Sequence, residues 1–125
     1  MVKVKTADLT GKALDYAVAT AKGLRLSIQS GEAVNITKDG GFFHHVRFTE
    51  FWSLCGQLME EMSISCYQSR DPATGKAFHW VGVCELVAPG RRKGLIADKP
   101  MVAICRAAVQ SRLGDEVDIP GELID

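Results

Sequence analysis

The sequence predicts one α+β domain over residues 1–125, with a helix near each end of the chain, a helix in the middle and antiparallel strands between them. Three observations predict this class. Apolar residues recur at helical spacing in three segments, apolar and polar residues alternate in the segments between them, and the strand–helix–strand repeat of a doubly wound sheet is absent. We therefore expect a central antiparallel sheet of about four to six strands with the three helices packed on it.

The N-terminal part of the chain predicts a strand, a helix and a hairpin. Residues 2–5 alternate apolar and basic side chains, as a short strand does. Asp8 or Thr10 then provides a cap for a helix that Gly23 ends. Residues 24–37 alternate again around Ser30-Gly31, which predicts a hairpin. The apolar stripe of the helix consists of Leu14, Ala17, Val18 and Ala21.

The middle of the chain predicts an extended aromatic segment, a second helix and a further hairpin. Phe42 to Phe48 is predicted to be extended, and Thr49 is predicted to cap a helix that reaches Met62. Residues 64–70 and 76–87 are predicted to pair as strands, because the residues 71–75 between them are a polar turn containing proline and glycine.

The C-terminal part predicts a basic loop, a final helix and a short tail. Residues 89–94 form the loop, and Asp98 is predicted to cap a helix with Pro100 in its first turn. Gly114 ends that helix. The apolar residues between 117 and 123 are expected to pack against the domain.

Composition indicates a soluble protein of a reducing compartment. The chain has 125 residues, 46% of them hydrophobic, and 15 basic residues balance 15 acidic ones. No net charge therefore attracts it to nucleic acid or to an anionic membrane. Its four cysteines contain no C-x-x-C pair, no secretion signal is recognisable, and no apolar run approaches the about 20 residues of a membrane span.

Two terminal blocks of the sequence carry a family resemblance. The first is Lys3 to Gly11 with Ala13 to Ala19, and the second is Pro100 to Arg106 with Leu113 to Pro120. They resemble the NinX-like family of short proteins from tailed bacteriophages and prophages, and a segment around Trp52 is more weakly similar. The resemblance implies a phage protein in the bacterial cytoplasm, but it implies no reaction. Residues 89–94 depart from the tryptophan- and glycine-rich stretch that the family has before its last helix.

The basic loop is the first candidate binding site. Gly90 to Gly94 places Arg91, Arg92 and Lys93 shortly before a helix N-terminus, and guanidinium groups with free backbone N–H groups suit a phosphate. The spacing is not that of a Walker motif. The alternative interpretation is a solvated surface loop.

Aromatic residues and neighbouring arginines form the second candidate site. Trp52 and Trp80 are candidates for stacking on a nucleobase, and Arg47 and Arg70 flank aromatic strands as cationic partners would. The alternative interpretation of the aromatic side chains is core packing.

The histidines form the third candidate. His44 and His45 lie on the aromatic strand and are candidate ligand-binding residues. Neighbouring strand residues point to opposite faces, so the pair does not suit one metal ion. We therefore expect no metal and no cofactor, and the sequence identifies no catalytic residue.

From the residues and the resemblance we expect a non-catalytic phage accessory protein. Within that class, a counter-defence factor that sequesters a small anionic nucleotide-like ligand is favoured. An inhibitor that binds a host protein is the first alternative, and a nucleotide-acting enzyme with His44, His45 or His79 as general base is the second. Nucleic-acid binding is disfavoured by the zero net charge. A homo-oligomer is compatible with the sequence.

Overall fold

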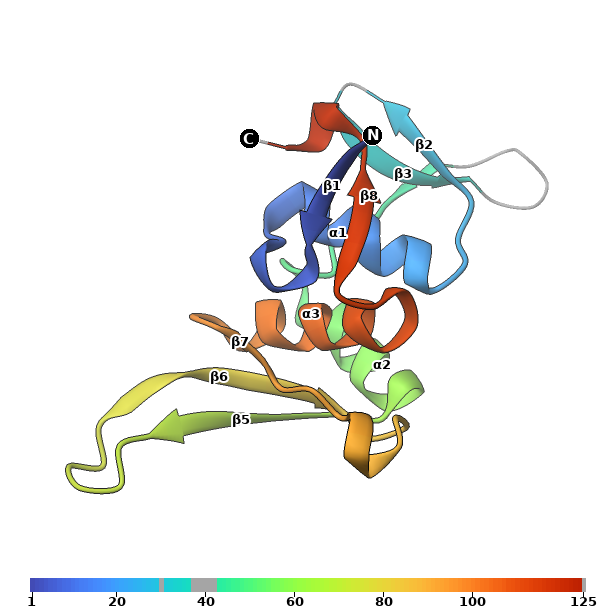
Figure 1. Ribbon diagram of the computed structural model, residues 1–125. Helices are drawn as coiled ribbons and strands as arrows, with labels where there is room; N and C mark the ends of the chain where they lie inside the picture. The colour runs from blue at the N-terminus through green and yellow to red at the C-terminus, as the bar shows by residue number, and fades with distance from the viewer. Residues whose placement is uncertain (30, 37–42, 125) are drawn as a thin grey trace.

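The computed structural model describes residues 1–29, 31–36 and 43–124, and its class is α+β, as predicted. The described residues form three α-helices near the N-terminus, in the middle and near the C-terminus (Figure 1). The helices are α1 (Gly11–Ala21), α2 (Trp52–Met62) and α3 (Pro100–Leu113), and short 3-10 turns are η1 (Thr6–Asp8), η2 (Pro89–Arg91) and η3 (Gly121–Leu123).

The strands of the described residues form three small antiparallel sheets and not the one central sheet of four to six strands that the sequence predicted. The first sheet pairs the two ends of the chain, β1 (Val2–Lys5) with β8 (Glu116–Ile119). The second contains β2 (Leu26–Gln29), β3 (Glu32–Ile36) and β4 (Phe43–His45), and the third contains β5 (Ile64–Arg70), β6 (Ala77–Cys84) and β7 (Leu95–Ala97).

The first and third sheets are separate because a helix lies between them. Figure 1 shows α3 between the β1–β8 pair and the β5–β6–β7 sheet, and α3 contacts α1, α2 and all three strands of that sheet. Its buried residues lie around more than one face of the helix, so α3 forms the centre of the core. These residues are Ala103, Ile104, Cys105, Ala107, Ala108 and Val109.

The predicted hairpins are confirmed. In the β5–β6 turn, Asp71 N–H donates to the Lys76 carbonyl at 2.8 Å, and Gly75 adopts a φ of +70° that favours glycine. Gly31, with a φ of +75°, lies in the β2–β3 turn. Phe42 lies outside the described residues. The β5–β6 hairpin projects from the body of the protein (Figure 1).

The helix starts differ in part from the prediction. Thr10 is the N-cap of α1, but Phe51 and not Thr49 precedes α2, and Lys99 and not Asp98 precedes α3. None of these N-cap side chains makes a cap hydrogen bond. The apolar pattern located the helices, whereas Thr49 bonds to Asp15 instead of capping α2, and Asp98 lies one residue before the N-cap of α3.

Helix α3 packs directly on the backbone of β6 at Gly82. A Cβ atom added at Gly82 would overlap the Ala103 carbonyl group, with the carbonyl carbon at 2.7 Å. Because backbone atoms cannot move aside as a flexible side chain can, glycine is required here.

Gly82→Ala should therefore lower the free energy of unfolding by about 1–3 kcal/mol through overpacking. Gly56→Ala is the matched control, since a Cβ there meets nothing within 4 Å in the middle of α2 and alanine favours helix. Urea denaturation of both variants measures the difference. Equal stability of the two variants would contradict the close approach of α3 and β6.

Candidate ligand-binding pocket

A pocket of about 790 Å³ opens where the starts of all three helices meet the β6–β7 strands. This volume lies within the range of small-molecule sites. The pocket is lined by residues of η1, the start of α1, the segment before α2, the third sheet and the first half of α3. They are Ala7, Asp8, Thr10, Gly11, Thr49, Glu50, His79, Ile96, Ala97, Asp98, Lys99, Val102 and Arg106.

Arg106 holds two walls of this pocket together. Its Nε donates to the Leu9 carbonyl at 2.9 Å, and its Nη1 donates to the Ile96 carbonyl at 2.6 Å. Partial burial lowers the pKa of the guanidinium, and the negative charges of Asp8 and Asp98 act in the opposite direction. Arginine remains cationic at any physiological pH. One side chain on α3 thus fixes both the segment before α1 and strand β7.

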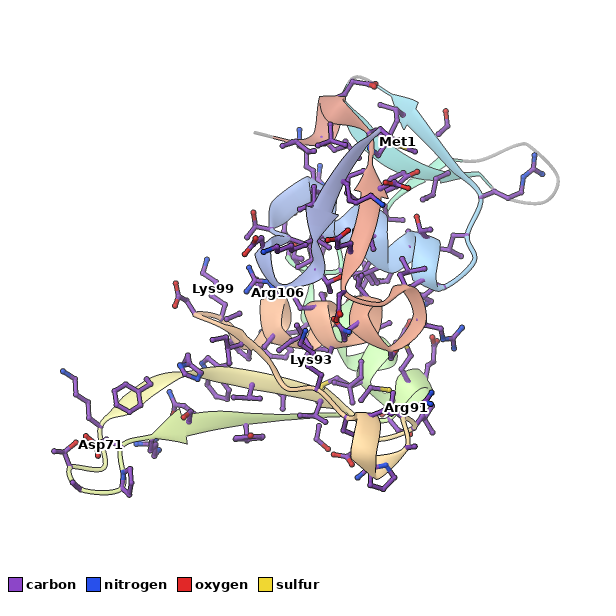
Figure 2. All side chains as sticks on the ribbon, in the orientation of Figure 1. Met1, Asp71, Arg91, Lys93, Lys99 and Arg106 are labelled. Carbon is purple, nitrogen blue, oxygen red and sulfur yellow. The ribbon has the colours of Figure 1, made fainter. Side chains whose placement is uncertain are left out.

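The pocket combines both signs of charge. Asp8, Glu50 and Asp98 bring carboxylates to it, while Lys99 and Arg106 bring cations. Figure 2 shows Lys99 and Arg106 on the same side of the molecule, next to the η1–α1 segment. A ligand that suits this pocket has hydrogen-bond donors for the carboxylates and acceptors or negative charge for the cations.

Helix N-termini add further positive potential. Thr10 and Gly11 at the start of α1, and Lys99 at the start of α3, line the pocket. The first N–H groups of a helix carry partial positive charge, and the N-cap side chains of these two helices make no cap hydrogen bond. Pro100 at the first position of α3 has no N–H, so the start of α1 is the better supplied of the two with donors for an anionic group.

Asp15 positions the wall that contains Thr49. The Thr49 N–H donates to Oδ1 of Asp15 at 2.9 Å, and the Thr49 hydroxyl donates to Oδ2 at 3.3 Å. Asp15 is buried in α1, and burial raises its pKa to about 6, although the hydrogen bonds from Thr49 act in the opposite direction. This carboxylate therefore titrates just below neutral pH.

The raised pKa of Asp15 makes its contribution to stability depend on pH. Between the usual pKa of 3.8 and about 6, the folded protein holds a proton that the unfolded chain releases, so the free energy of unfolding falls as pH rises. Asp15→Asn keeps an oxygen for the Thr49 N–H but does not titrate, so it should remove this fall in the free energy of unfolding. Its stability relative to wild type should increase by up to about 3 kcal/mol between about pH 4 and about pH 7.

Chemical denaturation of both proteins across this pH range measures the effect. Asp15→Ala is the control for the hydrogen bonds, because it leaves the Thr49 N–H without its acceptor and should destabilise at every pH. A difference between Asp15→Asn and wild type that does not change with pH would contradict the raised pKa.

The basic loop lies away from this pocket. Figure 2 shows Arg91 on the opposite side of the molecule from Lys99. Arg92 forms an ion pair with Glu85 at 3.1 Å and donates to the Val87 carbonyl. Lys93 forms an ion pair with Asp115 at 3.1 Å. Carboxylates of this chain therefore already partner Arg92 and Lys93, while the Arg91 side chain is exposed.

The aromatic and arginine candidates are divided between two regions. Arg47 forms an ion pair with Glu50 at 3.7 Å and, like the exposed Trp52, belongs to the segment that contributes Thr49 and Glu50 to the pocket. Arg70 instead lies beside the hairpin turn, where it donates to the Gly75 carbonyl. Trp80 is half-buried on β6. The predicted residues do not converge on one stacking site.

His44 and His45 lie on β4, opposite Asn35 and Val34 of β3, and their side chains lie outside what the structure describes. His79 lines the pocket. Within the described residues, no group of three or more histidine, cysteine, aspartate or glutamate side chains is arranged to hold a metal ion. No helix of the described residues is long and apolar enough to cross a membrane.

Sequence reasoning missed most of the pocket. Asp8 and Asp98 were interpreted as helix caps and Lys99 and Arg106 carried no signal in the sequence, and only the packing of α3 brings the four residues together. Asp15 did carry a signal, because it directly follows Leu14 of the apolar stripe and precedes Ala17. A carboxylate next to a buried stripe indicates a specific polar partner.

Comparison with solved structures places the fold among phage proteins. The 2.0 Å crystal structure of a phage protein from Bacillus cereus ATCC 14579 has this fold, with a TM-score of 0.54, 18% sequence identity and coverage of 86% of this chain and 87% of that chain. The family model described as "Bacteriophage P22, NinX" matches residues 5–112, and the chain belongs to this family. The predicted family is thereby confirmed, although Leu113 to Pro120 of the second terminal block lie outside the matched residues. A comparison with curated proteins gives no match.

Proposed function

We propose that this protein is a phage accessory protein that holds a small nucleotide-like molecule in the pocket at the helix starts and releases it chemically unchanged. The observation that carries the proposal is the pocket itself, in which carboxylates, cations and the first residues of two helices line one space of about 790 Å³. Such a combination of groups complements a nucleobase at one end and a phosphate at the other.

The carboxylates suit the base and sugar of such a ligand. Nucleobases present amino and ring N–H donors beside carbonyl and ring-nitrogen acceptors. Asp8, Glu50 and Asp98 accept hydrogen bonds, and the N–H groups of Arg106 that are not directed at Leu9 and Ile96 donate them. The same carboxylates repel a ligand that carries negative charge along its whole length. The phosphate of the ligand therefore lies in the part of the pocket away from them.

The phosphate end suits Lys99 and the start of α1. Lys99 is exposed at the pocket, so its ammonium group is accessible to an anion. Gly11 lines the pocket at the first position of α1, where a main chain without a Cβ atom allows close approach of a ligand.

A role in counter-defence, by removing a nucleotide signal of the host, is the biological form of this proposal. It is supported by membership of a phage family and by the ligand class that the pocket suits. Nucleotide chemistry that alters the ligand is the competing enzymatic function, and the recovered ligand distinguishes the two.

Incubation with a panel of mono-, di- and cyclic nucleotides should raise the melting temperature, because a ligand that binds only the folded state stabilises it. Lys99→Ala should reduce the binding constant by about ten-fold, the loss of one charge-assisted contact. Arg91→Ala is the matched control, since it removes an exposed cation on the other side of the molecule. Isothermal calorimetry measures both, and chromatography of the ligand after heat denaturation shows whether it is intact.

Weaker binding in Arg91→Ala with unchanged binding in Lys99→Ala would move the site to the basic loop. Altered ligand after incubation would replace sequestration by enzymatic activity. If no nucleotide of the panel raises the melting temperature, the proposed ligand class is excluded.

Binding of a host protein is the second candidate, and two exposed aromatic side chains favour it. Phe51 and Trp52 at the start of α2 are 50% and 54% exposed, and neighbouring exposed aromatics are typical of interface anchors. Phe51→Ser combined with Trp52→Ser should abolish co-purification of a host protein from infected cells while nucleotide binding persists. Retention of a partner by this variant would exclude the aromatic pair as its anchor.

A further inference from the structure

Strand β5 is an edge of the third sheet, and its hydrogen-bond pattern can be followed residue by residue. The Ser63 carbonyl accepts from the Glu85 N–H at 2.8 Å, and the register continues through Ile64 opposite Cys84 to Gln68 opposite Trp80. In an antiparallel pair, residues that bond to the partner strand alternate with residues that do not. The main-chain groups of Ile64, Cys66 and Gln68 therefore point away from β6, toward the outside of the sheet.

The opposite edge of the same sheet is shorter and partly occupied. Strand β7 has three residues, and its Ile96 carbonyl accepts the hydrogen bond from Arg106. At the β5 edge, in contrast, no hydrogen bond from elsewhere in the described residues reaches the main chain of Ile64, Cys66 or Gln68. The open edge of the sheet is β5.

The side chains of β5 do not protect this edge. From Ile64 to Ser69 the strand has no charged residue and no proline, the features that normally discourage strand pairing. The one irregularity lies at its end, between Gln68 and Arg70. Tyr67 projects on the face opposite α3, because Gly82, whose partner is Cys66, faces α3, and it is 55% exposed.

We propose that β5 pairs with β5 of a second copy of this chain, antiparallel about a two-fold axis at Tyr67. In this register every residue of β5 in one copy lies opposite a residue of β5 in the other copy. It places the outward main-chain groups of Cys66 opposite those of Gln68 of the second copy, and Tyr67 opposite Tyr67. The two sheets become one continuous sheet, and the tyrosines form a cross-strand aromatic pair.

Charge complementarity favours a second copy as the occupant. Arg70 is the only charged residue of β5, and it lies at the far end of the strand from α2. The antiparallel arrangement brings Arg70 of each copy to Ile64 of the other, next to the C-terminal end of α2, which has Glu60 and Glu61. Glu61 already forms an ion pair with Lys22 at 3.2 Å, so the negative end of the helix dipole and Glu60 are the groups that attract the arginine, and no like charges face each other across the axis.

The pairing is independent of the proposed ligand. No residue of β5 lines the pocket, so the pairing uses none of the residues proposed to hold the ligand.

Tyr67→Lys tests the proposal, because the register places the two new lysines directly opposite each other. We expect the dissociation constant of the dimer to rise at least about ten-fold in sedimentation experiments. Phe78→Lys is the matched control, since Phe78 is 61% exposed on the same hairpin but has no partner across the axis. Circular dichroism melting verifies that each variant is folded.

Tyr67→Cys gives a second readout that does not depend on weakened association. Residues opposite each other without main-chain hydrogen bonds have Cα atoms about 4.5 Å apart, a distance that a disulfide spans. Mild oxidation should cross-link Tyr67→Cys into a dimer, whereas Ser65→Cys, which would face Ser69 of the second copy, should stay uncross-linked. A wild-type protein that sediments as a monomer up to about 1 mM, or a dimer unaffected by Tyr67→Lys, would overturn the proposal.

Discussion

The burial of α3 is the constraint on which the other elements depend. Alanines and other small or medium residues cover this helix on several sides, so α1, α2 and the third sheet approach its backbone closely. The contact between Gly82 and Ala103 leaves no room for a methyl group. A helix that is apolar around most of its circumference must be surrounded, and α1, α2 and the third sheet cover different sides of α3, while the other two sheets contact α1.

The same helix assembles the pocket. Arg106 projects from α3 and binds the main chain on both sides, at Leu9 and Ile96, while Asp15 of α1 holds the segment before α2 through Thr49. Through these hydrogen bonds, the segments that lead into the three helices hold fixed positions relative to one another. Charged groups that are distant in the sequence consequently line one space, and a pocket preorganised in this way avoids the entropic cost of ordering loops when a ligand binds.

The pocket and the edge strand β5 lie on different parts of the protein, since no residue of β5 lines the pocket. The pocket offers donors, acceptors and charge to a small molecule, whereas the edge offers main-chain groups to another strand. Membership of the phage family covers both regions, since the match extends over residues 5–112.

The sequence by itself determined the local elements. The three helices follow from apolar periodicity, and the β5–β6 hairpin follows from alternation around a turn with Asp71 and Gly75, because these signals act between neighbours in the chain. The tertiary structure decided the rest. Pairing of β1 with β8, the division into three sheets and the meeting of Asp8, Asp98 and Arg106 involve residues far apart in the sequence. Such contacts depend on how α3 is buried, and local patterns do not encode which distant side chains a buried helix brings together.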